Sequence, residues 1–308
     1  MSKTKVIVVA GATASGKTRL AAEIAKAVSG EVISADSMQV YKGMSIATAA
    51  PSEEEKCGVR HHLVEFLDRS ESFSVSDFCC LAREKIGGIT ARGNVPVIAG
   101  GTGLFIDSLV DNIIFTQTET DFELRESLMK KSCEELYSML LEVDKEAAEK
   151  IHKNNKKRVV RALEIYYSSG KTKTAQDTAS KKEESPYDVL YFVIEYKNRE
   201  KLYSRINRRV DLMVEAGLVD EAQKALGEAG ATSAQAIGHK ELKPYFSNEK
   251  TLDDAISDIK KETRHYAKRQ ITWFKRRKDA VRLYADELGE GQLAETAIEK
   301  SREFLNAE

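Results

Sequence analysis

Cysteine and proline are scarce in this sequence, and long apolar runs are absent from it. It contains four cysteines and four prolines in 308 residues. No two cysteines form a Cys-x-x-Cys pair or lie near a histidine pair at zinc-finger spacing, so we expect neither a disulfide framework nor a structural metal. No apolar stretch reaches the roughly 20 residues that a membrane-spanning helix needs. With no signal-peptide pattern either, the chain is expected to be soluble and cytoplasmic.

An excess of charge of one sign is also missing. The net charge is −1, and the chain is 42% hydrophobic and 31% charged, which is ordinary globular composition. Residues 260–278, however, contain nine Lys or Arg and one Glu, and residues 150–161 contain six Lys or Arg and no acid. The nearly neutral total therefore conceals basic patches of the kind that bind acidic partners such as nucleic acid.

The N-terminal segment has the pattern of a βαβ unit. Residues 6–10 are a β-branched strand, residues 19–28 place apolar side chains on one helix face, and residues 31–35 are a second strand. Residues 95–99 form another buried strand that runs into a glycine-rich loop. Units of this kind build parallel sheets with helices on both faces, and ligands bind at the carboxyl ends of the strands.

The character of the chain changes after about residue 120, where it becomes helical and highly charged. Residues 171–185 are polar and are expected to form a loop. We therefore predict an α/β fold, a P-loop NTPase-like parallel sheet core with a helical insertion domain. The core, with its C-terminal helices, should comprise residues 1–115 and 186–308, and the insertion residues 116–185.

A complete P-loop motif, Gly-x-x-x-x-Gly-Lys-Thr, follows the first strand and precedes the first helix. Its backbone and the helix N-terminus can wrap a phosphate, Lys17 supplies a cation, and the Thr18 hydroxyl can bind Mg²⁺. The expected phosphate-binding residues are Gly11, Thr13, Ala14, Ser15, Gly16, Lys17 and Thr18. The motif does not identify the ligand, which can be ATP, another nucleotide or a diphosphate ester.

Two further polar residues lie at the ends of predicted strands. Asp36 follows the second strand, where its carboxylate can act as a general base, hold Mg²⁺ through water, or cap a helix. Thr102 lies among Gly100, Gly101 and Gly103, where it can hydrogen-bond a substrate or simply belong to a tight turn. Residue types and spacing leave these alternatives open.

The sequence resembles the tRNA dimethylallyltransferases, also called tRNA isopentenyltransferases. The matching stretches occur in family order and cover most of the chain: residues 11–18, 33–44, 61–63, 100–104, 205–211, 235–238 and 266–274. The P-loop alone is shared by many folds, whereas the joint set is specific. The resemblance implies an enzyme that transfers the dimethylallyl group of dimethylallyl diphosphate to N6 of the adenosine 3′-adjacent to the tRNA anticodon, with Mg²⁺ and with release of diphosphate.

The resemblance also implies roles for individual residues. Asp36 matches the general base, Thr102 contacts the target nucleotide, and either Arg205 or Arg209 grips the diphosphate. The insertion resembles the family's tRNA-clasping domain. The residues implied in tRNA binding are Asp36, Ser37, Met38, Gln39, Thr102, Arg125, Lys157, Arg158, Val159, Val160, Arg161, Gln235, Gly238 and Lys240. We expect a monomer.

Some positions depart from the family pattern and leave fine substrate preference open. Ala12 replaces a usual Pro, residues 47–49 read Ala-Thr-Ala where Gly-Thr-Ala is common, and Phe105 and His239 each replace a usual Tyr. The pair His61-His62 can bind a metal only with a third ligand, and none is spaced near it, so a structural or tRNA-contact role is favoured. Tyr41 either stacks on a base or packs in the core.

Three other functions compete with this interpretation. An enzyme that prenylates free adenine nucleotides shares the P-loop and base, but it has no need of the basic stretch around Lys157. A P-loop kinase or ATPase is disfavoured because no apolar run ends in a Walker-B Asp. An RNA-binding module without activity is disfavoured because Gly11, Gly16, Lys17 and Thr18 are intact.

Overall fold

A parallel β-sheet forms the centre of the computed structural model, which describes residues 3–114, 121–180, 183–227, 230 and 232–307. Within those residues the sheet has six strands in the order β3-β2-β4-β1-β5-β6, and every pair is parallel. The strands are β1 (Thr4–Gly11), β2 (Gly30–Ser34), β3 (His61–His62), β4 (Val95–Gly100), β5 (Tyr187–Glu195) and β6 (Val281–Tyr284). The predicted α/β class with a parallel sheet is therefore confirmed.

The chain divides into two compact units, one inserted into the sequence of the other. The first unit comprises Met1–Val110 and Pro186–Glu308 and contains the sheet, and the second comprises Asp111–Ser185 and is helical where the structure describes it. The tRNA-binding role that the resemblance implies for an insertion stays a prediction. None of the helices in the described ranges has the length and apolar character needed to cross a membrane.

Strands β1, β4 and β2 end at one edge of the sheet. In the register Ala10 lies opposite Gly100, and Ala99 opposite Ser34, so the loops that follow these three strands begin side by side. Gly100 permits the close packing of two of them, because a Cβ there would lie 2.1 Å from the carbonyl oxygen of Ala35. This edge is where parallel α/β sheets bind ligands.

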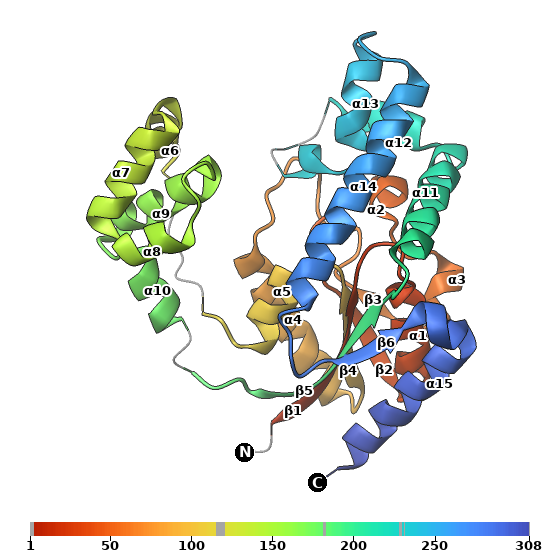
Figure 1. The fold of residues 1–308 in the computed structure, drawn as a ribbon. Helices are drawn as coiled ribbons and strands as arrows, with labels where there is room; N and C mark the ends of the chain where they lie inside the picture. The colour runs from red at the N-terminus through yellow and green to blue at the C-terminus, as the bar shows by residue number, and fades with distance from the viewer. Residues whose placement is uncertain (1–2, 115–120, 181–182, 228–229, 231, 308) are drawn as a thin grey trace. The chain divides into compact units, whose positions relative to one another are not determined.

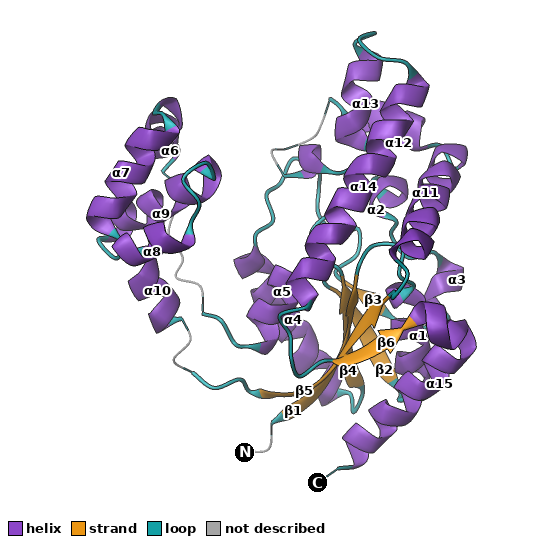
Figure 2. Ribbon diagram, viewed as in Figure 1, coloured by secondary structure: helices purple, strands orange, loops and turns teal. Residues whose placement is uncertain are grey.

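Helices cover both faces of the sheet (Figure 1 and Figure 2). α1 (Lys17–Ala27) and α15 (Ala285–Asn306) pack on one face and share a core cluster with the strands. α4 (Val75–Ala91) and α5 (Gly103–Val110) lie on the other face. The remaining helices of the unit lie toward the carboxyl edge: α2 (Ser45–Thr48), α3 (Glu53–Lys56), α11 (Arg199–Glu215), α12 (Leu218–Ala225), η1 (Ser233–Gln235), α13 (His239–Phe246) and α14 (Leu252–Phe274).

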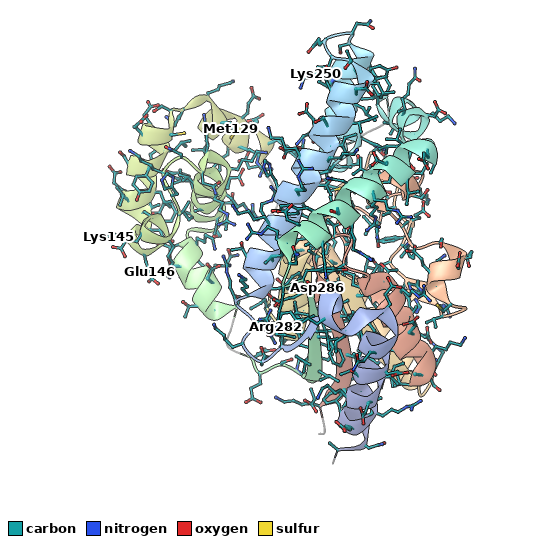
Figure 3. The ribbon with its side chains drawn as sticks, turned by 45° about the vertical axis from the view of Figure 1, so that its right-hand side comes forward. Met129, Lys145, Glu146, Lys250, Arg282 and Asp286 are labelled. Carbon is teal, nitrogen blue, oxygen red and sulfur yellow. The ribbon has the colours of Figure 1, made fainter. Side chains whose placement is uncertain are left out.

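The start of α11 is fixed by contacts from the far end of the chain (Figure 3). Asp286, at the start of α15, accepts hydrogen bonds from the backbone N–H groups of Lys197 and Asn198 at 3.0 and 2.9 Å. Arg282 of β6 pairs with Glu195 of β5 at 2.6 Å. These contacts set where α11, with its two candidate arginines, leaves the sheet.

The second unit has its own apolar core. Its helices are α6 (Phe122–Lys130), α7 (Cys133–Val143), α8 (Lys145–Lys150), α9 (Lys156–Ser169) and α10 (Lys173–Ala179). Leu136, Leu140 and Leu163 are fully buried between them. The prediction that residues 171–185 form a loop is wrong for the first half of this segment, which forms α10. Thr172 caps this helix, and Asp144 accepts hydrogen bonds from the N–H and the hydroxyl of Thr174. Residues 181–182 lie outside the described ranges.

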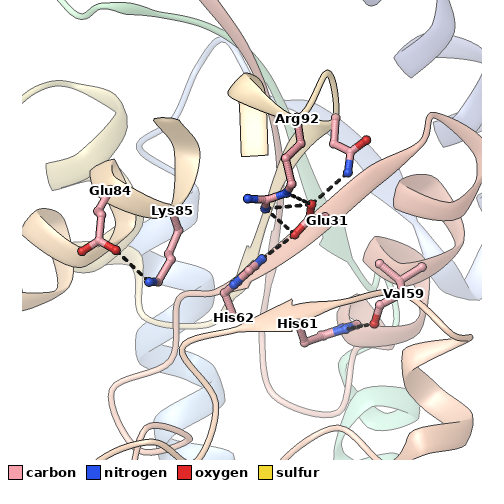
Figure 4. Close-up of polar contacts among 8 residues, drawn as sticks. Glu31, Val59, His61, His62, Glu84, Lys85 and Arg92 are labelled. Atoms are coloured by element: carbon pink, nitrogen blue, oxygen red, sulfur yellow. Dashed lines mark hydrogen bonds and ion pairs between the residues drawn. The ribbon is translucent and has the colours of Figure 1, made fainter. Parts of the chain in front are cut away.

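A buried carboxylate at the N-terminal edge of β2 holds His62, while Nδ1 of the neighbouring His61 lies 3.0 Å from the carbonyl oxygen of Val59 (Figure 4). Glu31 is 5% exposed and contacts His62 Nε2 at 2.7 Å, the Arg92 guanidinium at 2.8 Å and Asn94 Nδ2 at 2.8 Å. Burial raises the pKa of Glu31, but hydrogen bonds from Asn94, His62 and Arg92 outweigh it and lower the pKa to about 2. These contacts favour the structural role of the pair, and Tyr41 is fully buried, which favours its core role.

We predict that Glu31→Gln lowers the free energy of unfolding by about 2 kcal/mol at neutral pH, the size of one strong hydrogen bond to a charged group. Because the folded-state pKa lies below the ordinary value, the stabilisation is complete above about pH 5 and is lost as the pH falls toward 2. Urea unfolding at pH 7 and at about pH 4 measures both effects. Glu84→Gln, which removes an exposed pairing with Lys85, is the matched control. Equal losses for both variants would contradict the prediction.

Candidate active site

A cavity of about 330 Å³ opens at the carboxyl edge of β1 and β2. The P-loop contributes Thr13, Lys17 and Thr18 to its lining, and residues 36–39 contribute the loop after β2. The short helix α2 and helices α11, α13 and α14 supply the other walls. Residues that are far apart in the sequence therefore meet around one space within the first unit.

The P-loop presents positive charge to this cavity. Gly16 and Ala14 have positive φ values of 92° and 62°, which turn the loop tightly before α1 begins at Lys17. Burial lowers the pKa of Lys17 to about 8; the charge of Arg209 adds to the effect and that of Asp36 opposes it. Lys17 Nζ donates to the carbonyl oxygen of Ala12 at 3.3 Å. A helix N-terminus together with a lysine is suited to a phosphate group.

The structure separates the two candidate arginines. Arg209 lines the cavity and lies near enough to Lys17 for its charge to depress the lysine pKa. Arg205 is exposed; its Nε donates to the carbonyl oxygen of Ala14 at 3.1 Å, and its guanidinium lies 3.6 Å from Glu290. With Ser15 and Gly16, Arg205 lines a separate hollow beside the P-loop. Arg209 is therefore the arginine that faces the same space as Lys17 and Asp36.

Asp36 lines the cavity and also orders the loop after β2. Its Oδ1 accepts hydrogen bonds from the N–H groups of Met38 and Gln39 at 2.9 and 3.4 Å, which is an Asx turn. No helix starts here, so the helix-cap alternative does not apply. Among the described residues Oδ2 has no hydrogen-bond donor, so this oxygen is available to a substrate.

Thr102 and Tyr266 lie next to Asp36. Thr102 Oγ1 accepts from the N–H of Ser37 at 3.1 Å and lies 3.5 Å from the Ser37 hydroxyl, so it joins the loops after β4 and β2. Burial and then the charge of Asp36 raise the pKa of Tyr266, while hydrogen bonding to Thr102 and Gln270 lowers it less, so the phenol stays protonated. The Asp36 carboxylate, the Thr102 hydroxyl and the Tyr266 phenol thus lie together in one part of the site.

The wall formed by α2 is held through its main chain. Gln39 Nε2 donates to the carbonyl oxygens of Thr48 and Ala49 at 3.3 and 2.9 Å, while Gln39 Oε1 accepts from Ser34. Glu221 of α12 accepts from the N–H groups of Ile46 and Ala47 at 2.8 and 2.9 Å. The side chain of Gln39, predicted to contact tRNA, is therefore engaged within the protein.

The carboxylate of Glu221 also contacts His239, whose Nε2 lies 3.0 Å from a carboxylate oxygen. Burial raises the pKa of Glu221, but hydrogen bonds from His239 and from the Ala47 and Ile46 amides outweigh it and lower the pKa. The predicted tRNA contacts Gln235, Gly238 and Lys240 also line the cavity. Glu221 thereby ties the α2 wall to the start of α13.

The candidate tRNA residues of the second unit divide into exposed and buried groups. Lys157, Arg158 and Arg161 are exposed on α9, and Arg125 of α6 is also exposed. Val159 and Val160, however, are 0% and 1% exposed in the core of the unit, so their side chains pack inside it, and their part in tRNA binding stays a prediction. On a helix these positions face inward with Leu163.

A single buried carboxylate orients two of the exposed arginines. Glu164 is 4% exposed, and its oxygens lie 2.8 Å from Arg125 Nε and 3.3 Å from Arg161 Nη1. Nothing in the sequence pattern pointed to Glu164, because a glutamate in a basic helix is usually a solvated residue.

Two residues of α14 line the cavity although the sequence analysis did not predict them as site residues. Tyr266 and Gln270 lie one turn apart and both line the cavity. Their four-residue spacing inside the matched stretch 266–274 was the available signal, since it places them on one helix face.

The donor set fits a magnesium ion carried by a phosphate ligand rather than a preformed metal centre. Among the described residues, no group of three or more His, Cys, Asp or Glu side chains is arranged to hold a metal. The Thr18 hydroxyl and the Asp36 carboxylate line the same cavity. Mg²⁺ commonly takes one or two protein oxygens and completes its shell with substrate phosphates and water.

Two family models match the chain. One, described as IPP transferase, matches residues 39–277, and the other, described as Isopentenyl transferase, matches residues 4–72. Curated relatives named tRNA dimethylallyltransferase include that of Acetivibrio thermocellus, which is 47% identical over 289 residues and covers 92% of both chains. The relative from Bacillus subtilis is 44% identical over 280 residues, 89% of this chain and 88% of its own.

Solved structures of similar proteins agree with these matches. The full-length tRNA isopentenylpyrophosphate transferase of Bacillus halodurans gives a TM-score of 0.74 at 39% identity, over 98% of this chain and 97% of its own. A eukaryotic dimethylallyltransferase described as acting on tRNA gives a TM-score of 0.84 at 30% identity, over 98% of this chain and 79% of its own.

We predict that the affinity for an alkyl diphosphate falls as the pH rises through about 8, where Lys17 loses its charge. The phosphate groups of the ligand are fully ionised above about pH 7, so the ligand itself contributes little to this change. Titration calorimetry between about pH 7 and pH 9.5 measures the dissociation constant across this range. Lys17→Met should bind weakly throughout and show no such step, while Lys26→Met, an exposed change on the same helix, should keep it. A step that persists in Lys17→Met would assign the titration to another group.

Proposed function

The chain belongs to the IPP transferase family and transfers a prenyl group to tRNA, and on that premise we propose the donor, the acceptor atom and the roles of the site residues. The donor is dimethylallyl diphosphate, and the acceptor is N6 of the adenosine 3′-adjacent to the anticodon. The bond from the dimethylallyl carbon to the diphosphate oxygen breaks, a carbon–nitrogen bond forms, and N6 loses one proton. One observation carries this proposal: Lys17, Arg209 and Asp36 face a single cavity.

The P-loop end of the cavity holds the diphosphate. Lys17, Arg209 and the amides at the start of α1 offset the negative charge that the leaving diphosphate acquires, and such preorganised charges contribute strongly to catalysis. Arg209 rather than Arg205 takes this role, because Arg205 lies outside the cavity and is bound to Ala14. The Thr18 hydroxyl would hold Mg²⁺ together with oxygens of the bound phosphate, and the ion would supply further charge neutralisation.

The part of the cavity beside Asp36 receives the adenine amino group. This amine is a weak nucleophile because its lone pair is delocalised into the ring, so removal of its proton during bond formation raises its reactivity. Asp36 is placed to accept that proton through Oδ2, while two backbone N–H groups hold Oδ1. Thr102 and Tyr266 position the adenine beside Asp36.

Apolar side chains in the cavity wall suit the hydrocarbon group. Ile206, Val210 and Met213 of α11 line the cavity on one side, and Ala47 of the α2 wall also lines it. An apolar surface stabilises a five-carbon chain by excluding water, and it also protects the activated carbon from hydrolysis.

The acceptor is an RNA rather than a free nucleotide. The target base must leave its stack to reach a cavity of this kind, as in other enzymes that act on bases. Lys157, Arg158, Arg161 and Arg125 provide exposed positive charge in the second unit for phosphate contacts. The names of the curated relatives also favour tRNA over the adenine-nucleotide and kinase alternatives.

A transfer assay tests this function. The enzyme is incubated with Mg²⁺, radiolabelled dimethylallyl diphosphate and either unmodified tRNA or AMP, with ATP turnover followed in parallel. We expect label on tRNA alone, at the adenosine beside the anticodon. Label on AMP alone would assign the protein to free-nucleotide prenylation, and ATP hydrolysis without label would assign it to the kinase or ATPase class.

In the same assay Asp36→Asn should lower the transfer rate by about 10² to 10⁴-fold, the usual contribution of a general base. Asparagine can still accept the hydrogen bonds of the Asx turn, so the loop and the tRNA affinity should be preserved. Asp77→Asn, a helix cap on α4 outside the cavity, is the control and should transfer at the rate of the unchanged enzyme. Full activity in Asp36→Asn would remove this carboxylate from the mechanism.

A further inference from the structure

A buried glutamine joins the two glycine-rich loops of the active site. Gln270 of α14 is 5% exposed, its Oε1 accepts a hydrogen bond from the N–H of Thr13 at 2.8 Å, and its Nε2 donates to the carbonyl oxygen of Gly101 at 2.9 Å. Thr13 belongs to the P-loop, and Gly101 precedes Thr102. One side chain therefore bonds to the main chain of both loops, 169 residues away from one and 257 from the other.

The space around Gln270 fits this residue closely. A Cβ on Gly101 would lie 2.2 Å from Gln270 Nε2, so the loop approaches the amide as closely as a glycine allows. The two bonds need an acceptor and a donor on one planar group, which a glutamine provides and a glutamate, leucine or methionine of similar length does not.

Neighbouring residues fix the position of α14 against the same loop. Trp273 Nε1 donates to Asp107 of α5 at 2.6 Å, and its ring occupies the space in which Gly103 would carry a Cβ. One turn before Gln270, Tyr266 lies close enough to Thr102 for that hydroxyl to lower the pKa of its phenol. Tyr266, Gln270 and Trp273 thus follow one face of α14 and contact three successive residues, Thr102, Gly101 and Gly103.

We propose that Gln270 is a positioning residue that sets the separation between the P-loop and the Thr102 loop, and thereby the distance between the prenyl carbon and the adenine amine. The proposal rests on the proposed function, in which the first loop holds the donor and the second places the acceptor. Transfer between two separately bound substrates depends strongly on this distance, since a displacement of about 1 Å can cost on the order of 10²-fold in rate. Gln270 touches neither reacting atom and acts through the two loops.

The first variant is Gln270→Met, which keeps the length of the side chain and removes both hydrogen bonds. In the folded protein we expect kcat to fall about 10 to 100-fold and KM for dimethylallyl diphosphate to rise, because the Thr13 amide loses its partner. Thr272→Met, on the exposed side of the same helix, is the control and should change neither constant. A merely structural role predicts a lower Tm with kcat per folded molecule and KM unchanged, and that result would overturn the proposal.

A second pair of variants tests the contact itself. Gly101→Ala places a methyl group against Gln270 Nε2 and should reproduce the loss of kcat seen in Gln270→Met. In a Gln270→Ala background the methyl group has space, so adding Gly101→Ala should cost much less than it does alone. Equal costs in the two backgrounds would show that the two residues act independently and would also overturn the proposal.

Direct binding separates this inference from the proposed function. Calorimetry with dimethylallyl diphosphate alone should show weaker binding by Gln270→Met than by the unchanged protein and by Thr272→Met. If the unchanged protein binds this ligand but transfers nothing to tRNA, the proposed function fails, while the binding difference still supports the effect of Gln270 on the P-loop. Equal binding by all three proteins, together with equal transfer, would overturn the positioning role.

Discussion

The shared ending of β1, β4 and β2 at one sheet edge is the constraint on which the active site depends. Parallel pairing brings the P-loop, Asp36 and Thr102 to one edge although they are separated by up to about ninety residues of sequence. The packing of Gly100 on Ala35 keeps two of these loops in contact. Every other part of the site, from the α2 wall to the face of α14, packs around this edge.

Charges of both signs meet in the cavity. Lys17 and Arg209 both face it, and burial, followed by the charge of Arg209, lowers the pKa of Lys17. Asp36 lies near enough to both cations for its charge to act on each of them, and the Thr102 hydroxyl and the Tyr266 phenol lie beside it. In the proposed function, a bound diphosphate offsets the repulsion between the two cations.

Local patterns in the sequence predicted the parts of this structure that depend on neighbouring residues. The P-loop can be identified from eight consecutive residues. The positions of Asp36 and Thr102 follow from the rule that parallel sheets bind ligands at the carboxyl ends of their strands. The contacts of Gln270 and Glu221, and that of Glu164 with Arg125, could not be found in this way, because these partners lie on other helices or loops. Arg205 and Arg209 are four residues apart on α11, so the sequence does not distinguish them, whereas the structure does by the cavity that each lines and by the contact of Arg205 with Ala14. The burial of Val159 and Val160, by contrast, follows from helix periodicity, because both lie on the face of α9 that carries Leu163.

The wall formed by α2 is anchored by hydrogen bonds from Gln39 and Glu221 to its backbone, and Ile46 and Ala47 also pack against an apolar cluster of α11 to α14. A substitution at Ala47 leaves the backbone bonds in place, because main-chain atoms make them. Ala47 lines the cavity, so the size of the residue at this position changes the space that the cavity offers. This short helix is therefore the place to begin in redesigning the cavity for a larger ligand.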